Sequence, residues 1–263
     1  MSIIGIIGFG YVGGAVASSY ADEKVLINDP IKHPASSTSY ETMMKKCRVI
    51  FVCVPTPQSD DGTCDTSIME AVLQGLEGYD GLVICKCTAP PNVYTRLEEE
   101  LDLKLVHVPE FLTQARAKYD YVNPHKIVVG CKKKLRDEVA EVLLASAVNF
   151  DRVNIEYCNI ATASFFKYFA NNVLAIKVIV NNEFSVLASA LDVKWDEVAR
   201  IASTDSRLGN THWAVPGPDG QAGYGGACFP KDTAAFARLA EPHNIQLSVL
   251  NAAIQANKLM RDE

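Results

Sequence analysis

The sequence predicts an α/β fold in which a doubly wound parallel sheet is followed by an all-helical region. In the first half of the chain, short apolar runs typical of strands alternate with helical stretches, as they do in β-α-β units. After about residue 151 the alternation stops, and residues 160–191 contain neither glycine nor proline, as expected for one long helix. We therefore expect a sheet domain at residues 1–155 and a helical domain at residues 156–263.

Each element follows from its local pattern. Runs rich in Val, Ile and Leu predict strands, in chain order, at residues 3–7, 24–28, 49–54, 81–86, 105–107 and 126–130. Helical patterns occur near residues 12–20, 40–45, 67–75, 92–99 and 135–146, and after the long helix near 195–203, 231–241 and 245–262. Residues 205–227 are rich in glycine and proline, and a loop of this length without regular structure is usually functional.

The composition argues against several classes of protein. The 263 residues carry a formal net charge of −6, which provides no basic surface for nucleic acid. The apolar stretch at residues 173–180 is short and interrupted by Lys177, so we expect no membrane partner. A strand pattern begins directly after Met1, without a signal peptide, and the 8 cysteines lack paired metal-ligand spacing. We expect a cytoplasmic protein with reduced thiols and no bound metal.

A glycine-rich turn follows the first strand and opens a helix. It reads Gly8-Phe9-Gly10-Tyr11-Val12-Gly13, the dinucleotide-binding pattern of a Rossmann-type domain. Gly8 permits the tight turn, Gly10 lets the backbone approach a pyrophosphate, and Gly13 allows the helix to pack closely on the strand. The N–H groups at the start of the helix then face the anion.

Four further side chains are candidate cofactor contacts. Asp29 ends the second strand, 21 residues after Gly8, where a carboxylate accepts hydrogen bonds from a ribose diol and repels a 2′-phosphate. We therefore expect NAD as the cofactor, rather than NADP, with Lys32 close by. Thr56 and Thr88 follow two later strands, at the edge where a parallel sheet places its ligands. The prolines of these two turns are equally consistent with simple strand ends.

Five residues outside the glycine turn suggest oxidation through a covalent intermediate. Glu110 follows a strand and would activate water, although a helix-capping role explains it equally well. Lys167 and Asn171 are four residues apart on the long helix and project from one face, where an ammonium among aromatic neighbours would stabilise an oxyanion. A surface lysine with a packed stem is the alternative. Cys228 follows two glycines and precedes Asp232, so its thiol lies in a tight turn before a helix, as a nucleophile would.

Together these motifs resemble the UDP-glucose/GDP-mannose dehydrogenase family, the nucleotide-sugar 6-dehydrogenases. The matching segments extend over nearly the whole chain in the family's order, at residues 8–13, 55–57, 86–88, 109–112, 126–130, 167–171, 182–183 and 225–232. The resemblance implies that Cys228 is the nucleophile and Glu110 the base for thioester hydrolysis. It implies that Lys167, Asn171 and Asp232 hold the sugar O6 and a catalytic water, with Thr88 beside that water.

The resemblance also implies the ligand contacts. The cofactor contacts are Gly8, Gly10, Tyr11, Val12, Gly13, Asp29, Lys32, Thr56, Thr88 and Gln114. The substrate contacts are Glu110, Phe111, Leu112, Lys167, Asn171, Arg207, Tyr224 and Gly225. Family members commonly have a second Glu where this chain has Gln114, and an amide carries no charge. Full-length members continue into a second α/β domain that covers the nucleotide, whereas this chain stops at Glu263.

The implied function is the NAD-dependent, two-step oxidation of a nucleotide sugar, with UDP-glucose converted to UDP-glucuronate, a polysaccharide precursor. Two alternatives stay open. A β-hydroxyacid-type dehydrogenase has a similar Lys-x-x-x-Asn helix, oxidises its substrate once and needs no thiol. A binding or assembly module would catalyse nothing. The helix at residues 160–191 is apolar on more faces than a small domain covers, so we expect a homodimer.

Overall fold

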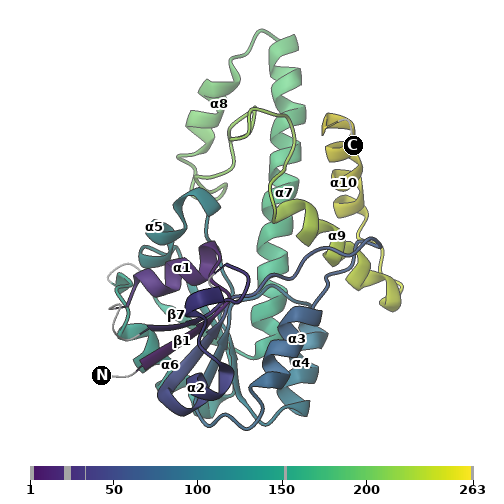
Figure 1. Ribbon diagram of the computed structural model, residues 1–263. Coiled ribbons are helices and arrows are strands. Elements are labelled where there is room, and N and C mark those ends of the chain that lie inside the picture. Colours follow the sequence, from purple (N-terminus) through teal and green to yellow (C-terminus); the bar gives the residue numbers. More distant parts are fainter. Residues whose placement is uncertain (1–2, 21–24, 33, 151–152, 262–263) are drawn as a thin grey trace. The chain divides into compact units, whose positions relative to one another are not determined.

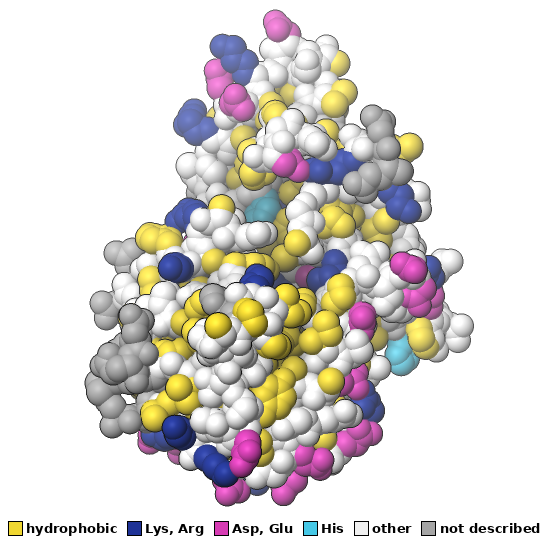
Figure 2. Space-filling model, viewed as in Figure 1, with side chains coloured by type: hydrophobic (Ala, Val, Ile, Leu, Met, Phe, Trp, Pro, Cys, Tyr) yellow, Lys and Arg dark blue, Asp and Glu magenta, His cyan; other side chains and the backbone are white. Residues whose placement is uncertain are grey.

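The computed structural model describes residues 3–20, 25–32, 34–150 and 153–261, which form two compact units. The sheet unit is drawn from residues 1–57 and 65–167, and the helical unit from residues 58–64 and 168–263. Figure 1 shows the elements of both units, coloured from purple at the N-terminus to yellow at the C-terminus, and Figure 2 shows the same view with side chains coloured by type. The short segment 58–64 therefore belongs to the helical unit although it lies early in the sequence.

The sheet unit contains a seven-stranded sheet with the spatial order β2-β1-β3-β4-β5-β6-β7. Its strands are β1 (Ile3–Ile7), β2 (Val25–Asn28), β3 (Cys47–Val52), β4 (Leu82–Cys85), β5 (Lys104–His107), β6 (Ile127–Gly130) and β7 (Ile155–Cys158). Neighbours pair in parallel except β5 and β6, which are antiparallel. The strand order reverses between β1 and β3, where such sheets bind ligands at the carboxyl ends of their strands. The predicted fold class is confirmed.

Helices cover both faces of this sheet. They are α1 (Tyr11–Ser18), α2 (Tyr40–Lys46), α3 (Ser67–Gly75), α4 (Pro91–Glu100), α5 (Ala117–Val122), α6 (Arg136–Leu144) and the start of α7 (Ile160–Ala190). Successive strand residues point to opposite faces, so Ile6 joins the core under α1, α5 and α6, and Ile7 joins the core under α2, α3 and α4. The expected strand at 24–28 is observed from Val25 onwards, since Lys24 lies outside the described residues.

The helical unit is built on α7, with α8 (Trp195–Ala202), α9 (Phe229–Ala240) and α10 (Ser248–Arg261). Helix α7 begins in the sheet unit and continues without a break into the helical unit. The buried core of the helical unit consists of Ala175, Ile179, Tyr224 and Ala253. Helices α9 and α10 match the expected helices near 231–241 and 245–262, except that Asp262 lies outside the described residues.

Helix α7 exposes much of its apolar surface. Phe169, Val173, Val180, Phe184 and Leu187 are each more than a third exposed, and their spacing places them along one side of the helix; we call them the apolar stripe. By length and composition alone α7 is able to cross a membrane, with a mean hydropathy of 1.4. The absence of a membrane partner, which the interruption by Lys177 suggests, therefore stays a prediction.

Candidate active site

The turn between β1 and α1 is shaped to take a pyrophosphate. Gly8 has a φ of 87°, in the left-handed region that favours glycine. A Cβ on Gly13 would lie 2.1 Å from the carbonyl oxygen of Gly8, so α1 packs against the turn at a distance that excludes a side chain. Around Gly10, the Lys32 ammonium, at 3.9 Å, is the nearest described group to where a Cβ would be. This open backbone at a helix N-terminus fits the diphosphate of NAD.

Asp29 directly follows β2, and its carboxylate accepts hydrogen bonds from the backbone of the glycine turn and from the backbone of the residues that follow it. Phe9 N–H donates to its Oδ2 at 2.7 Å, and the N–H groups of Ile31 and Lys32 donate to Oδ1 at 3.2 and 2.8 Å. Burial acts to raise the pKa of Asp29, but these donors and the Lys32 ammonium together lower it below its usual value. The carboxylate is thus ionised at neutral pH, and Oδ2 keeps a lone pair for a ribose hydroxyl.

The two polar turns expected at strand ends are joined to each other. Thr56 follows β3 and Thr88 follows the neighbouring strand β4, and the Thr56 hydroxyl donates to the carbonyl oxygen of Thr88 at 2.6 Å. The Ser164 hydroxyl, on α7, donates to the carbonyl oxygen of Ala89 at 2.6 Å. These bonds fix the carboxyl edge of β3 and β4 beside the glycine turn.

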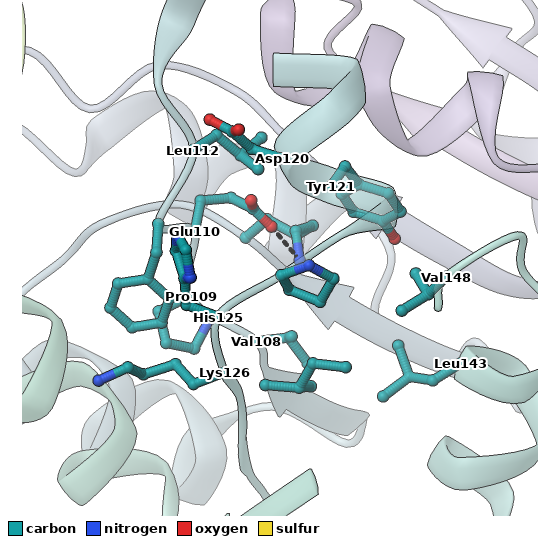
Figure 3. A pocket seen from close by; sticks show the side chains of 14 residues that line it. Val108, Pro109, Glu110, Leu112, Asp120, Tyr121, His125, Lys126, Leu143 and Val148 are labelled. Carbon is teal, nitrogen blue, oxygen red and sulfur yellow. Dashed lines mark ion pairs between the residues drawn. The ribbon is translucent and has the colours of Figure 1, made fainter. Parts of the chain in front are cut away.

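Glu110 is held by two lysines from different elements. Lys86, the residue after β4, forms an ion pair with the Glu110 carboxylate, and the two side chains are 4% and 14% exposed. The dashed line in Figure 3 marks this pair. Lys167, near the start of α7, donates from Nζ to the backbone carbonyl oxygen of Glu110, and its Nζ lies 5.2 Å from the centre of the Phe111 ring. One lysine therefore holds the side chain of Glu110, and the other holds its backbone.

A cavity of about 50 Å³ adjoins this ion pair, which is large enough for a small number of water molecules. Figure 3 shows its walls, which are mostly apolar and include Val108, Pro109, Leu112, Tyr121 and Val148. Phe111 also lines it, whereas Gln114 is exposed at the start of the next short helix, η3 (Gln114–Arg116). The cavity thus has room for water beside the Glu110 carboxylate, and Asp120, His125 and Lys126 also line it.

In the helical unit, Asn171 and Asp232 form a buried hydrogen-bonded pair. The Asn171 amide donates to Asp232 Oδ2 at 2.5 Å, and Lys231 forms an ion pair with Oδ1 at 2.7 Å. Asp232 is 1% exposed, so these partners satisfy a carboxylate that is almost completely out of water. Cys228 stands directly before α9, and its carbonyl oxygen accepts the Asp232 N–H at 2.9 Å. Cys228 and Asp232 are therefore joined through the backbone of the first turn of α9.

Side chains of α7 and α10 hold the loop that precedes Cys228. Asn182 Oδ1 accepts the N–H of Gly223 at 3.1 Å, and Asn257 Oδ1 accepts the N–H of Tyr224 at 2.7 Å. A Cβ on Gly225 would lie 2.5 Å from a nitrogen of the Arg261 guanidinium, so a side chain there would displace this guanidinium.

Arg207 differs from the other predicted substrate contacts. Its guanidinium pairs with Asp205 in the same turn, and its side chain is 86% exposed. The sequence-predicted site residues thus lie in two sets. The sheet unit holds the cofactor candidates, Glu110 and Lys167, and the helical unit holds Asn171, Arg207, Tyr224, Gly225, Cys228 and Asp232.

Sequence reasoning overlooked Lys86, although it stands in one of the matching motifs. It also overlooked Asn182, Asn257 and Arg261, which hold the loop. Lys86 directly follows a fully apolar strand, and a charge in that position is the signal that could have revealed it. Amides such as Asn257 give no such signal, because an exposed helix carries the same residue type.

Two segments of the chain match known domains. Residues 32–148 match the NAD binding domain of the UDP-glucose/GDP-mannose dehydrogenase family, and residues 161–259 match the central domain of the same family. The chain belongs to this family. The family match agrees with the geometry of the glycine turn, which fits the diphosphate of NAD. The sheet unit therefore contains an NAD-binding domain.

Curated relatives and solved structures agree with this family. The chain is 31% identical over 229 residues to a UDP-glucose 6-dehydrogenase of Pseudomonas aeruginosa, with 81% of this chain and 49% of the relative covered. It is 28% identical over 227 residues to a UDP-glucose 6-dehydrogenase of Rickettsia felis, with 83% and 49% covered. The chain spans about half the length of the curated relatives it matches. A UDP-glucose dehydrogenase from Pyrobaculum islandicum has the same fold, with a TM-score of 0.83, 24% identity, and 100% of this chain and 69% of that chain covered.

Proposed function

We propose that this protein oxidises the CH2OH group of a nucleotide sugar to a carboxylate in two steps, with NAD as the oxidant. The observation that carries the proposal is the position of Cys228 directly before α9, one helical turn from Asp232, which forms a buried pair with Asn171. A dehydrogenase that oxidises an alcohol once has no need of a thiol, whereas a second oxidation needs the aldehyde held as an adduct.

The atoms balance as follows. The CH2OH group loses a hydride and a proton and becomes an aldehyde. The Cys228 thiol adds across the C=O bond to give a thiohemiacetal, which loses a second hydride and its hydroxyl proton to become a thioester. Water attacks the thioester carbon, the C–S bond breaks, and a carboxylate and the free thiol result. NAD, which the glycine turn and Asp29 would hold, would supply the hydride acceptor for each oxidation, so that two NADH would form and one water would be consumed per acid.

Each residue takes a role that its surroundings support. We assign Lys167 and Asn171 to the oxygen that develops charge, and Asp232 to the positioning of Asn171, to which it is hydrogen-bonded. We assign Glu110 to the removal of a proton from the hydrolytic water, since its carboxylate adjoins a cavity that has room for water. We assign Thr88 to a position beside the hydrolytic water and the nicotinamide.

The ligand contacts are proposed on the same basis. For the cofactor we propose the glycine turn with Asp29, Lys32 and Thr56, and also Gln114. For the substrate we propose Phe111, Leu112, Tyr224, Gly225 and Arg207. UDP-glucose is the proposed substrate because several curated relatives are named UDP-glucose 6-dehydrogenase. One structural neighbour, from Pyrococcus horikoshii, is named a UDP-D-ManNAc dehydrogenase.

We further propose a cytoplasmic homodimer without a membrane partner. Its two domains are residues 1–155, which bind NAD, and residues 156–263, which carry the dimer contact and the substrate loop 205–227. The apolar stripe of α7 supports the dimer, because a row of exposed Phe, Val and Leu side chains is stabilised when a second copy covers it.

The test is the stoichiometry of the purified chain with UDP-glucose and NAD, together with Cys228→Ser. We expect two NADH per acid for the wild type. We expect NAD binding but no acid for Cys228→Ser, because serine is a poorer nucleophile and its ester resists hydrolysis. Cys158→Ser, at the end of β7, is the matched control and should keep full activity. One NADH per substrate would favour the β-hydroxyacid-type alternative. Binding of both ligands without turnover would favour a binding module.

A further inference from the structure

We propose that Lys86 is the positioning residue of Glu110, keeping its carboxylate ionised and correctly oriented to take a proton from the hydrolytic water. This inference rests on the proposed function for the role of Glu110 as the base. The contact itself, a buried ion pair between the residue after β4 and the turn after β5, is a property of the fold.

The strand register brings the two residues together. Strands β4 and β5 are parallel neighbours, paired from Leu82 with Lys104 to Cys85 with His107. Lys86 and the Glu110 turn therefore leave the sheet at the same edge. The Lys86 ammonium also lies 5.4 Å from the centre of the Tyr121 ring, on α5, which borders the same cavity. Lys86 thus stands between a carboxylate and an aromatic face, and its side chain is almost fully buried.

Several charged and titratable groups surround the pair, and three of them, Asp120, His125 and Lys126, line the same cavity (Figure 3). The Lys167 ammonium contacts the backbone carbonyl oxygen of Glu110, so it fixes the turn. His107 is completely buried and uncharged at neutral pH, since burial lowers its pKa to about 3. Burial also lowers the pKa of Lys86, to about 8, while the neighbouring thiols, those of Cys53, Cys85 and Cys87, act in the opposite direction. The Glu110 carboxylate favours the ammonium form of Lys86 as well, and the ammonium in turn favours the carboxylate.

Removing Lys86 would leave a carboxylate in a mostly apolar pocket without its partner charge. An uncompensated charge in such a site is strongly unfavourable, so the carboxyl would take up a proton at a higher pH than before. A protonated Glu110 cannot accept a proton from water. The expected defect is therefore specific to hydrolysis, since the two oxidations do not use this base.

The experiment compares the wild type with Lys86→Met, Lys86→Gln, Lys86→Arg and Glu110→Gln. The matched control is Lys104→Met, which removes a lysine that pairs with Glu138 at the opposite end of β5, where both side chains are more than a quarter exposed. The first measurement is the pH dependence of acid formation. The second is the mass of the intact protein, which reports thioester on Cys228. The third is a ¹³C NMR titration of the Glu110 carboxyl, assigned with Glu110→Gln, which needs no turnover.

For Lys86→Met and Lys86→Gln we expect the acid limb of the kcat profile to move up by about one pH unit or more. The KM for UDP-glucose should be nearly unchanged, and thioester should accumulate on Cys228 below the shifted limb. The NMR titration should show the same upward shift. Lys86→Arg, which keeps the charge, should restore most of the wild-type profile, and Lys104→Met should match the wild type.

The proposal is overturned if neither the pH profile nor the carboxyl titration moves when the charge at position 86 is removed. It is also overturned if the wild-type Glu110 carboxyl titrates above pH 7, a result that does not depend on any variant at position 86. A wild type that forms no acid would contradict the proposed function instead. The NMR titration would then decide by itself whether Lys86 controls the ionisation of Glu110.

Discussion

The sheet unit and the helical unit are stabilised in different ways. The sheet unit has two apolar cores, one on each face of its sheet, with fully buried residues such as Phe51, Ile6 and Leu73. The helical unit has a core of Ala175, Ile179, Tyr224 and Ala253, and it exposes the apolar stripe. Buried amides take over part of the role of a core there, since Asn171, Asn182 and Asn257 each hold another segment of the unit.

The difference indicates what each unit needs in order to stay folded. Burial of apolar area on both faces gives the sheet unit a stability of its own, which core substitutions should reveal. A hydrogen bond contributes about 1 kcal/mol net, so the amide contacts fix the position of the loop that precedes Cys228 more than they supply stability. Covering the apolar stripe would add the burial that the helical unit lacks.

The largest effect is expected from the core of the sheet unit. Phe51→Ala removes a completely buried ring from β3 and should lower the unfolding free energy of this unit by about 3–5 kcal/mol. Urea unfolding followed by the amide signals of β1 and β3 measures it. Tyr119→Ala, which removes a mostly exposed ring from α5, is the control and should cost far less. A loss for Phe51→Ala no larger than for the control would show that the sheet unit does not depend on its core.

An intermediate effect is expected from acid, and again in the sheet unit. The Nδ1–H group of His107 donates to the Cys85 carbonyl oxygen at 3.0 Å, and none of the described residues pairs with Nε2. Burial lowers the pKa of His107 from 6.5 to about 3, with the Lys86 and Lys167 ammoniums acting in the same direction. Below pH 6.5, His107 therefore binds a proton in the unfolded chain but not in the folded unit. This stabilisation is complete above that pH and is lost as the pH falls towards 3.

At pH 5 the loss should be about 2 kcal/mol relative to pH 8. Urea unfolding of wild type and His107→Gln at both pH values measures it, because the variant lacks the titrating group and should lose less between the two. If wild type and variant lose equal amounts, His107 does not account for the acid sensitivity of the sheet unit.

The smallest effect on unfolding is expected on the apolar stripe. Phe184→Glu changes a side chain that is 57% exposed, so the unfolding free energy of the helical unit should change by less than about 0.5 kcal/mol. The same change should nevertheless dissociate the proposed dimer, because a carboxylate would be buried against the second copy. Sedimentation at micromolar concentration separates the two forms. Val186→Glu, on the other side of α7 and 72% exposed, should leave the dimer intact. A monomeric wild type would refute the dimer.

Much of the fold was predictable because its signals are local. Alternating apolar runs and helices predict the sheet, and the glycine turn predicts its first β-α unit. Strand β7, with the sequence Ile-Glu-Tyr-Cys, was not predicted, because it is short, half-buried and polar at its second residue. The membership of residues 58–64 in the helical unit has no local signal either. One contact that holds this segment is the hydrogen bond from Arg238 to the carbonyl oxygen of Asp61, at 2.7 Å. It comes from a residue that is distant in the sequence.

The candidate site divides in the same way. The residues with distinctive chemistry, Cys228 and Glu110 among them, could be selected from their motifs. The pairing of Lys86 with Glu110 could not, because it depends on two strands lying side by side in register. The sequence gives the type of each residue directly, whereas the partner of each charged side chain depends on the tertiary structure.

The contacts of Arg261 have a consequence for the order in which the protein matures during synthesis. Its guanidinium donates to Asp219 Oδ2 at 2.8 Å and to the Gly223 carbonyl oxygen at 3.3 Å, within the loop that leads to Cys228. A ribosome therefore makes the strands β1 to β7 and the thiol itself before it makes the Arg261 side chain, which completes the contacts that hold the loop. The sheet unit can begin to fold while it is still tethered, but the contacts of Arg261 with this loop form only after residue 261 has left the exit tunnel. Until then a nascent chain carries Cys228 beside a loop that lacks these contacts.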